Sequence, residues 1–284
     1  MILELSGKGQ FRIREEINMN LNVTMTVEEI KQTLLNILIQ FDHMCKKYNL
    51  KYSLAYGTLI GAARHSGFIP WDDDIDVVMP QDDYLKLISI EEVKNPHQRY
   101  SLHMGECEKK YGEHYVYPFA KLEDNYTKMI YHHSKDTGGA FIDIFPVTGL
   151  PCDMNERKKY ISKMLKLQAI IGVGDYCSDK IASNLKSLFY FSGYRFIRNR
   201  MIKNAFQFDY FNCDYVAQSI WSFGEREIFK NDLFENLIDI SFEGYNFKAF
   251  ANYDEILKQL YGDWRKLPPQ EQRISHHDYD LVLL

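Results

Sequence analysis

The chain has 284 residues and a mass of 33.6 kDa, with 45% hydrophobic and 26% charged residues, as expected for a soluble globular protein of one large or two small domains. Its formal net charge of −5 argues against a globally basic nucleic-acid-binding protein, so we expect no nucleic-acid partner. The five cysteines are scattered and odd in number, which argues against a disulfide framework and favours a cytoplasmic protein. Residues 1–20 carry no apolar signal-peptide core, and no run of about 18 apolar residues predicts a membrane span.

The N-terminal part of the chain predicts an arm followed by a long helix. Residues 1–22 alternate loosely between apolar and polar types, which favours a short hairpin or an extended arm. Thr26 followed by Glu29 is a capping-box pattern, and apolar residues then recur at helical spacing. We therefore expect a helix of about 20 residues that ends near Asn49.

Short strands and helices alternate in the next hundred residues. Gly57 and Thr58 predict a tight turn between a strand at 52–56 and a short helix at 59–64. A strand at 75–79 precedes a helix that starts at DDYLKLISI, with Gln81 or Asp82 as its cap. Further strands are expected at 100–104, 115–122 and 140–145, the last of them stopped by Pro146.

Residues 154–208 predict helices with an unbalanced charge, since eleven basic residues stand against three acidic ones. Residues 180–211 also contain many aromatic side chains, which fits a helix lying on an anionic membrane surface. Recognition of a polyanionic acceptor and a merely solvated basic face are alternatives, and we favour peripheral membrane contact. Beyond this segment, residues 227–250 predict strands, 252–262 a helix and 263–278 a loop.

Four aspartates crowd into the stretch WDDDIDVVMP, where Asp74 and Asp76 lead into an apolar strand. Alternate side chains of a strand point to the same side, so these two carboxylates would repel each other. A divalent cation removes that repulsion, and Mg²⁺ or Mn²⁺ prefers such oxygen ligands. A solvated acidic turn is the alternative interpretation of the aspartates. If the metal site exists, Asp72 and Asp73 in the loop before the strand are supporting groups or helix caps.

Three further features favour a metal and phosphate site. Asp143 lies within the apolar strand AFIDIFPV, where a lone charge is costly unless it is paired or bound to metal. Gly57 and Thr58 lie between a strand and a helix, where backbone N–H groups and a hydroxyl bind phosphate. Arg64, His65 and Lys121 are nearby cations suited to phosphate oxygens, although each could be an ordinary surface charge.

A small-residue turn, an Asp-x-Asp pair and a third strand aspartate are the arrangement of the nucleotidyltransferase fold. The stretch YGTLIGAARHSGFIPWDDDIDVVMPQDDY closely resembles the LicD/fukutin family, as do FAKLEDNYT, FIDIFPVTGLP and YGDWRKLPPQEQRISHH. The four blocks occur in the family's order and span roughly residues 26–278. The resemblance implies an α+β fold with a nucleotidyltransferase-like mixed sheet core flanked by helices and an added basic helical subdomain. We place the N-terminal arm at 1–25, the catalytic core at 26–153, the basic helical subdomain at 154–211 and a segment completing the core at 212–284.

The resemblance also implies a reaction and its residues. Bacterial members of the family move phosphocholine from CDP-choline to sugars of teichoic acid or lipopolysaccharide precursors, and eukaryotic relatives move ribitol phosphate from CDP-ribitol. By this resemblance Asp74, Asp76 and Asp143 are the catalytic carboxylates and hold Mg²⁺ or Mn²⁺, with Asp143 as a further metal ligand or as the base. Substrate or phosphate contacts are expected at Gly57, Thr58, Arg64, Lys121, Asp124 and His276.

Other interpretations remain open at this point. His276 and His277 are adjacent, so only one of them could reach a given ion, and hydrogen bonding within a loop is the plainer interpretation. Trp71 and Trp264 could stack on cytosine or enclose a trimethylammonium group, although core packing is the more common role.

The donor could carry choline, ethanolamine, ribitol or glycerol. A nucleotidyltransferase, a glycosyltransferase and a non-catalytic glycopolymer-binding module are the competing functions. The main interpretation is a metal-dependent phosphotransferase for substituted phosphate groups, cytoplasmic and peripheral at the inner face of the cell membrane. Its partners would be CDP-choline and a lipid-linked glycan or teichoic acid precursor.

Overall fold

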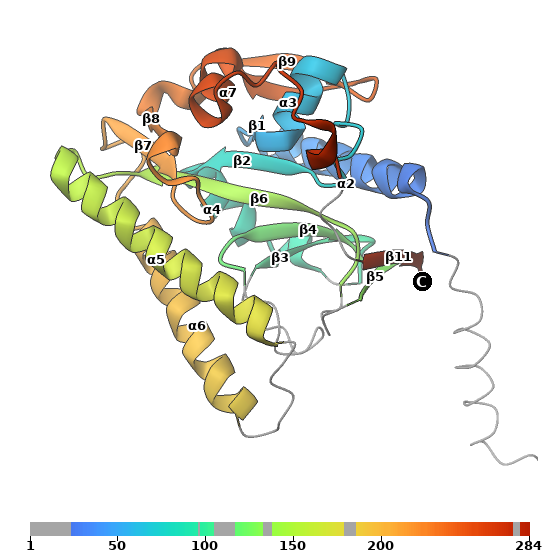
Figure 1. Cartoon of the computed structure of the whole chain (residues 1–284), viewed down its shortest axis with the longest axis horizontal. Helices are drawn as coiled ribbons and strands as arrows, with labels where there is room; N and C mark the ends of the chain where they lie inside the picture. Colours follow the sequence, from blue (N-terminus) through green and yellow to red (C-terminus); the bar gives the residue numbers. More distant parts are fainter. Residues whose placement is uncertain (1–23, 96, 105–116, 133–137, 179–185, 275–278) are drawn as a thin grey trace, which may run out of the picture.

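A curled, mixed seven-stranded β-sheet forms the centre of the computed structural model, which describes residues 24–95, 97–104, 117–132, 138–178, 186–274 and 279–284 (Figure 1). The neighbouring strands β2 and β6 run parallel, and the other paired strands of this sheet run antiparallel. The main strand order is β1 (Ser53–Leu54), β2 (Asp76–Pro80), β6 (Phe141–Gly149), β4 (Ala120–Asp124) and β3 (Tyr100–Met104), while β7 (Tyr215–Gln218) joins β6 to β8 (Ile228–Lys230).

Six helices accompany the sheet in the described residues, together with two smaller sheets. The helices are α2 (Val27–Tyr48), α3 (Tyr56–His65), α4 (Gln81–Ser89), α5 (Met154–Ser178), α6 (Lys186–Ala205) and α7 (Tyr253–Tyr261). The hairpin of β9 (Leu237–Phe242) and β10 (Tyr245–Phe250) lies near α3 and α7, and β11 (Tyr279–Leu283) pairs with β5 (Thr127–Tyr131) (Figure 1). The mixed sheet flanked by helices is as expected, whereas β5 and β11 were not predicted.

Helix α2 confirms the capping box and the predicted end of the helix. The Thr26 hydroxyl accepts a hydrogen bond from the Glu29 backbone N–H, and the Glu29 carboxylate accepts one from the Thr26 backbone N–H at 2.7 Å. Asn49 ends the helix in the left-handed conformation, with φ of 52°. The apolar face of α2 packs against β4 and β6, so this helix supports the two strands that carry Lys121 and Asp143.

Pro146 does not end its strand, contrary to the prediction. The Asp143 N–H points toward β2 because it donates to the Ile75 carbonyl, so by alternation Pro146 faces the other side of β6. On that side the pairing with β4 has ended at Ile144, and the pairing with β7 begins at Val147. The missing N–H of proline therefore falls between two partner strands, where no ladder hydrogen bond is lost.

Several other boundaries differ from the prediction. Helix α3 begins at Tyr56, so Gly57 and Thr58 belong to its first turn and not to a separate turn before it. The strand expected at 115–122 is β4, which starts only at Ala120, and the residue that caps α4 is Pro80. The longer sequence patterns predicted the correct type of element. The first and last residues of those elements differed, because they depend on contacts between segments distant in sequence.

The helices α5 and α6 lie side by side along one flank of the sheet (Figure 1). They fall within the segment with the basic charge excess, as the helical pattern predicted. Within the described residues, every helix is too short or too polar to traverse a lipid bilayer. The predicted arm at 1–22 lies outside the described residues, and the domain boundaries stay a prediction.

Candidate active site

A row of charged side chains crosses three neighbouring strands of the sheet. Asp76 of β2 lies directly opposite Asp143 of β6, which in turn lies opposite Lys121 of β4. Residues that are paired in register project to the same face of a sheet, so the three side chains lie in line. Lys121 Nζ is 3.2 Å from Asp143 Oδ1. The structure thus brings together three residues that the sequence placed in three separate blocks.

Helix α3 brings Thr58 and Gly57 to the same row. The Thr58 hydroxyl is buried and accepts a hydrogen bond from the Asp76 backbone N–H at 2.9 Å. A β-carbon added to Gly57 would lie 2.6 Å from Asp72 Oδ2, so this glycine makes room for the Asp72 carboxylate. Both residues therefore position aspartates in the structure, and their expected contact with donor phosphates stays a prediction.

The carboxylates of the cluster repel one another strongly. Burial raises the pKa of the Asp76 carboxyl well above its usual range, and the charges of Asp74, Asp143 and Asp72 raise it further. Lys121 acts in the opposite direction, but one ammonium does not balance the surrounding acids. Asp74 precedes β2 and does not lie on it, yet its charge reaches Asp76 as the spacing predicted.

This donor set fits a divalent cation. The charges of Asp74, Asp143 and Asp72 all act on the Asp76 carboxyl with a deficit of positive charge, and carboxylates are the ligands that Mg²⁺ and Mn²⁺ prefer. Within the described part of the chain, no three carboxylate, imidazole or thiol groups are already gathered closely enough to enclose a metal ion. The residues that would hold the cation are Asp74 and Asp76, with Asp143 and Asp72 beside them, and these assignments stay predictions.

Aromatic rings surround the Lys121 ammonium. Its nitrogen lies 3.3 Å from the centre of the Phe141 ring and 4.4 Å from that of Tyr117, and the side chain is only 8% exposed. Cation–π attraction and the Asp143 ion pair therefore fix this ammonium at the end of the row. A contact between Lys121 and a diphosphate stays a prediction.

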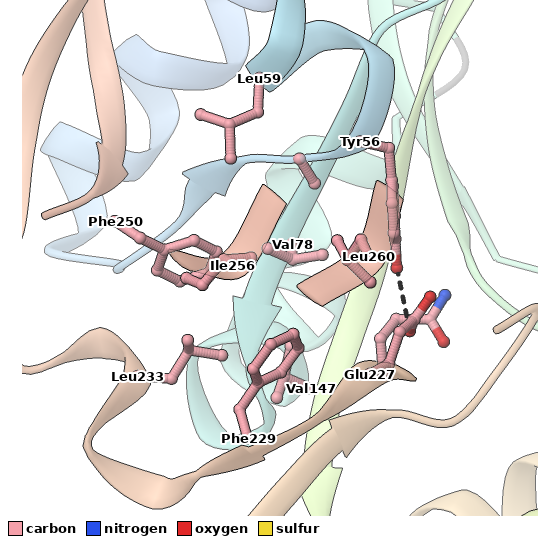
Figure 2. Close-up of a pocket in the computed structure, with 12 residues that line it drawn as sticks. Tyr56, Leu59, Val78, Val147, Glu227, Phe229, Leu233, Phe250, Ile256 and Leu260 are labelled. Atoms are coloured by element: carbon pink, nitrogen blue, oxygen red, sulfur yellow. Dashed lines mark hydrogen bonds between the residues drawn. The ribbon is translucent and has the colours of Figure 1, made fainter. Parts of the chain in front are cut away.

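A buried carboxyl group lies below the start of α3. The Tyr56 hydroxyl donates a hydrogen bond to Glu227 Oε2 at 3.2 Å, and the Phe223 N–H donates to Glu227 Oε1 at 3.0 Å. Figure 2 shows Tyr56 and Glu227 at the edge of an apolar cavity of about 30 Å³. Burial raises the pKa of Glu227 to about 8. Nothing in the local sequence around Glu227 indicated this position, because its partners lie far away in the chain.

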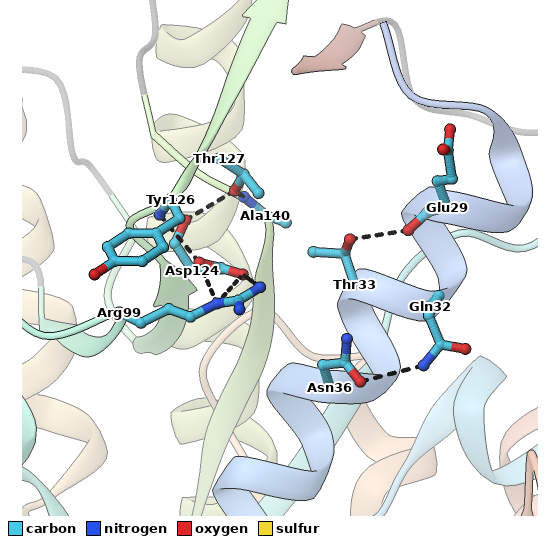
Figure 3. Close-up of polar contacts among 9 residues, drawn as sticks. All are labelled: Glu29, Gln32, Thr33, Asn36, Arg99, Asp124, Tyr126, Thr127 and Ala140. Carbon is cyan, nitrogen blue, oxygen red and sulfur yellow. Dashed lines mark hydrogen bonds and ion pairs between the residues drawn. The ribbon is translucent and has the colours of Figure 1, made fainter. Parts of the chain in front are cut away.

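Asp124 has a set of partners away from the row. Its fully buried carboxylate forms an ion pair with Arg99, with Nη2 and Oδ2 at 2.9 Å, and accepts a hydrogen bond from the Tyr126 N–H at 3.0 Å (Figure 3). Its backbone carbonyl accepts from the Thr127 hydroxyl, which in turn accepts from the Ala140 N–H. In the structure Asp124 joins β4, β5 and the start of β6, while its expected substrate contact stays a prediction.

Arg64 is anchored by the loop after α7. Its Nη1 donates to the Trp264 carbonyl at 2.7 Å and its Nε donates to the His65 ring at 3.0 Å. Trp264 is buried in the core, and Trp71 is half-buried and packs against the core. Both positions agree with the core-packing interpretation of these two tryptophans. The predicted phosphate contact of Arg64 remains open to test. His276 and its neighbour His277 lie outside the described residues.

Comparison with known proteins assigns the family. Residues 49–168 match the family described as LicD/FKTN/FKRP, nucleotidyltransferase domain. Over 277 residues the chain is 32% identical to the lipopolysaccharide cholinephosphotransferase LicD of Haemophilus influenzae, a match that covers 92% of this chain and 99% of that protein. The chain belongs to the LicD family.

Two shorter matches cover parts of this chain. An uncharacterized protein of Rickettsia prowazekii is 34% identical over 77 residues, which is 24% of this chain and 29% of that protein. An uncharacterized protein of Rickettsia typhi is 41% identical over 58 residues, or 20% of this chain and 19% of that protein. The three residues of the charged row, which we call the carboxylate row after its two aspartates, are Asp76, Asp143 and Lys121. All three fall inside the range that matches the LicD family description.

Proposed function

We propose that this protein is a metal-dependent transferase that moves phosphocholine from CDP-choline to a sugar hydroxyl of a cell-surface glycan precursor, of lipopolysaccharide or teichoic acid type. The observation that carries the proposal is the row Asp76–Asp143–Lys121 on adjoining strands, in a chain 32% identical to a lipopolysaccharide cholinephosphotransferase over nearly its whole length. In this proposal the sheet and its flanking helices are a nucleotidyltransferase-like core.

The reaction exchanges one phosphate ester for another. The acceptor hydroxyl oxygen forms a bond to the phosphorus that carries choline, the bond from that phosphorus to CMP breaks, and CMP leaves with the electron pair. Asp74 and Asp76 would hold a divalent cation, which would supply positive charge to the diphosphate oxygens. Asp143, which lies beside Asp76, serves either as a further metal ligand or as the base that takes the hydroxyl proton.

In this proposal the remaining residues of the site position the aspartates or bind the donor phosphates. Thr58 fixes the backbone at Asp76, and Gly57 admits the Asp72 carboxylate into the cluster. Lys121 balances part of the negative charge before the donor binds. Arg64 and His276 are proposed to contact the phosphates.

Titration calorimetry of the full-length protein with CDP-choline, with and without Mg²⁺ or Mn²⁺, tests the proposal. CDP-ribitol, CDP-glycerol, CDP-ethanolamine, CTP and CMP serve as comparison ligands, and CMP release in the presence of a glycan acceptor reports turnover. We expect metal-dependent binding of CDP-choline that Asp74→Ala abolishes. The matched control is Asp232→Ala, which removes an exposed aspartate that lies outside the row.

The other outcomes of this titration separate the competing functions. Preferred binding of another CDP-alcohol would keep the chemistry and change the head group. Turnover of CTP with release of pyrophosphate would favour a nucleotidyltransferase. Failure to bind any cytidine nucleotide in the presence of metal would overturn the transferase proposal and favour a glycopolymer-binding module.

The basic helices are proposed to contact an anionic membrane surface, where lipid-linked acceptors reside at the inner face. Leu165, Ile170 and Phe196 are exposed on α5 and α6. The same two helices form a groove of about 500 Å³ with a mostly basic lining. Its lining residues are Lys158, Lys159, Ser162, Lys163, Lys166, Leu167 and Arg200. Apolar and basic side chains together are typical of interfacial helices.

A liposome pelleting assay tests the membrane contact. We expect binding to vesicles with anionic lipid that weakens as salt rises, and that Lys159→Glu combined with Lys166→Glu reduces. Charge reversal at Lys248, which pairs with Asp239 on the β9–β10 hairpin, is the control because it lies outside both helices. A wild-type protein that stays in the supernatant at low salt removes this part of the proposal.

A further inference from the structure

Four aromatic rings form a continuous series beside the carboxylate row, and we call them the aromatic belt: Phe145, Tyr56, Phe223 and Tyr261. Their ring centres are each 5.8 Å from the next, and all three contacts are edge-to-face. Phe145 lies two residues after Asp143 on β6, so it projects to the same face of the sheet. The belt thus starts at the row and continues outward from it.

The belt passes next to the aspartates. Tyr56 lies between Ala55, whose N–H donates to the Asp76 carbonyl at 3.0 Å, and Gly57, against which the Asp72 carboxylate packs. At its far end, the charges of Asp76, Glu227, Asp72 and Asp74 act on the Tyr261 hydroxyl and add to burial in raising its pKa. Acidic groups therefore lie near the outer end of the belt.

The outer two rings of the belt are accessible to a ligand. Phe223 is 54% exposed and Tyr261 is 39% exposed, whereas Phe145 is buried. Tyr56 has a left-handed backbone, with φ of 47°, and its buried hydroxyl is held by Glu227. This conformation is uncommon for a large side chain and persists only where the surrounding contacts enforce it. Tyr56, Phe223 and Tyr261 thus form a fixed corner of three rings that opens to solvent beside an acidic cluster.

The rings near Lys121 have a cation over them, and the outer rings of the belt do not. At the Lys121 end, the rings of Phe141 and Tyr117 already have an ammonium over them. Among the described residues, no lysine or arginine lies over Phe223 or Tyr261. The outer corner therefore offers ring surface near acidic groups, and no lysine or arginine of the described residues lies over Phe223 or Tyr261.

We propose that the corner of Tyr56, Phe223 and Tyr261 binds the trimethylammonium group of the donor's choline. This inference rests on the proposed function, since it assigns the head group of that donor. A quaternary ammonium cannot donate a hydrogen bond, so aromatic faces and nearby negative charge are the groups suited to recognise it. In phosphocholine two carbons separate the nitrogen from the phosphate ester oxygen, so its subsite has to adjoin the phosphate site, as this corner adjoins Asp76.

The test compares donors that differ only in the head group. Dissociation constants for CDP-choline, CDP-ethanolamine, CDP-glycerol and CMP are measured with Mg²⁺ on the full-length protein and on Phe223→Leu and Tyr261→Leu. Leucine keeps apolar bulk and removes the ring face. Phe223→Tyr keeps an aromatic face, and Phe211→Leu is the matched control because Phe211 is 67% exposed and packs on Tyr210 outside the belt.

We expect each leucine variant to weaken CDP-choline binding by about 5- to 30-fold, and to do so more than it weakens binding of CMP. Phe223→Tyr should restore most of the preference for choline, and Phe211→Leu should leave the preference at the wild-type value. Thermal unfolding of each variant checks that the protein still folds.

The contradicting results are distinct for the two proposals. Equal losses for CDP-choline and CMP, or no loss, overturn the choline subsite and leave the transferase proposal intact. A wild-type preference for CDP-glycerol over CDP-choline also overturns the subsite, because that head group carries no cation. A wild-type protein that binds no cytidine nucleotide with metal overturns the proposed function, and the subsite falls with it.

Discussion

The Thr58 hydroxyl accepts a hydrogen bond from the Asp76 backbone N–H at 2.9 Å and thereby joins the first turn of α3 to the first residue of β2. Thr58→Val keeps the shape of the side chain but leaves this buried N–H without its acceptor. We expect a loss of about 1–3 kcal/mol in the free energy of unfolding and a fall in transfer rate of roughly tenfold to a hundredfold, because Asp76 loses its fixed position. Chemical denaturation and CMP release measure the two effects.

Thr58→Ser is the matched control, since it keeps the hydroxyl and removes only a methyl group. Its transfer rate should stay within a few fold of the wild-type rate. A loss of rate in the serine variant with little or none in the valine variant would show that packing of the methyl group, and not the hydrogen bond to Asp76, positions the carboxylate.

Asp76→Asn should separate stability from activity. The variant removes one charge from a cluster in which Asp74, Asp143 and Asp72 raise the pKa of Asp76 by repulsion. In metal-free buffer we expect a gain of about 1–2 kcal/mol in unfolding free energy and a complete loss of transfer, as is usual when a strained functional group is neutralised. Thermal unfolding with EDTA and a CMP-release assay with Mg²⁺ measure the two quantities.

The control for that variant is Asp232→Asn, which removes an exposed carboxylate outside the cluster. It should change neither stability nor transfer beyond about 0.5 kcal/mol. A lower metal-free stability of Asp76→Asn would mean that the carboxylate makes net favourable contacts, and the argument for a metal site from charge repulsion would then fail.

Gly57→Ala acts on Asp72. The added β-carbon would lie 2.6 Å from Asp72 Oδ2, so the Asp72 carboxylate has to shift. Alanine is also the better helix former at this position in α3. We expect unfolding free energy equal to or slightly above the wild-type value, with weaker Mg²⁺-dependent binding of CDP-choline measured by calorimetry.

Gly193→Ala places the same methyl group in α6, where nothing among the described residues lies within 4 Å of it apart from its chain neighbours and the backbone of the same helix. It should share any gain from helix propensity and keep wild-type binding of CDP-choline. Unchanged binding in Gly57→Ala would show that Asp72 has no part in donor recognition.

The two aspartates of the row were predictable because each breaks a local pattern. Asp76 and Asp143 are charges at apolar strands, and that conflict pointed to a shared cation before any neighbour was known. Their direct opposition was not predictable, since strand register depends on pairing between segments far apart in the sequence. The same limit explains the error at Pro146, whose tolerance depends on where β4 ends and β7 begins.

The outer parts of the site carried no local signal. Glu227 and Phe223 lie in a short loop about 150 residues after Asp76, and they contribute through contacts with Tyr56. Asp124 lies in a block shared with the family, and only the structure reveals its ion pair with Arg99, while its expected substrate contact stays a prediction. Resemblance therefore located the region, while the role of each residue depended on three-dimensional contacts.

Glu227 should make stability depend on pH. Burial raises its pKa in the folded protein to about 8, from a model-peptide value near 4.5, so folding takes up a proton between these two values. Its contribution to stability is therefore fully present below about pH 4.5 and is lost progressively as the pH rises toward about 8. Glu227→Gln keeps a neutral group of similar shape at all pH values and should remove this component.

Urea denaturation of both proteins at several values between about pH 5 and about pH 8.5 measures the effect. The difference between the two pH profiles isolates Glu227, because the other titrating groups are common to both proteins. We expect the wild-type protein to lose more stability than Glu227→Gln as the pH rises through this window. Parallel profiles would mean that Glu227 is already ionised in the folded protein at the lower pH, and that the hydrogen bonds from Tyr56 and Phe223 stabilise a carboxylate and not a carboxylic acid.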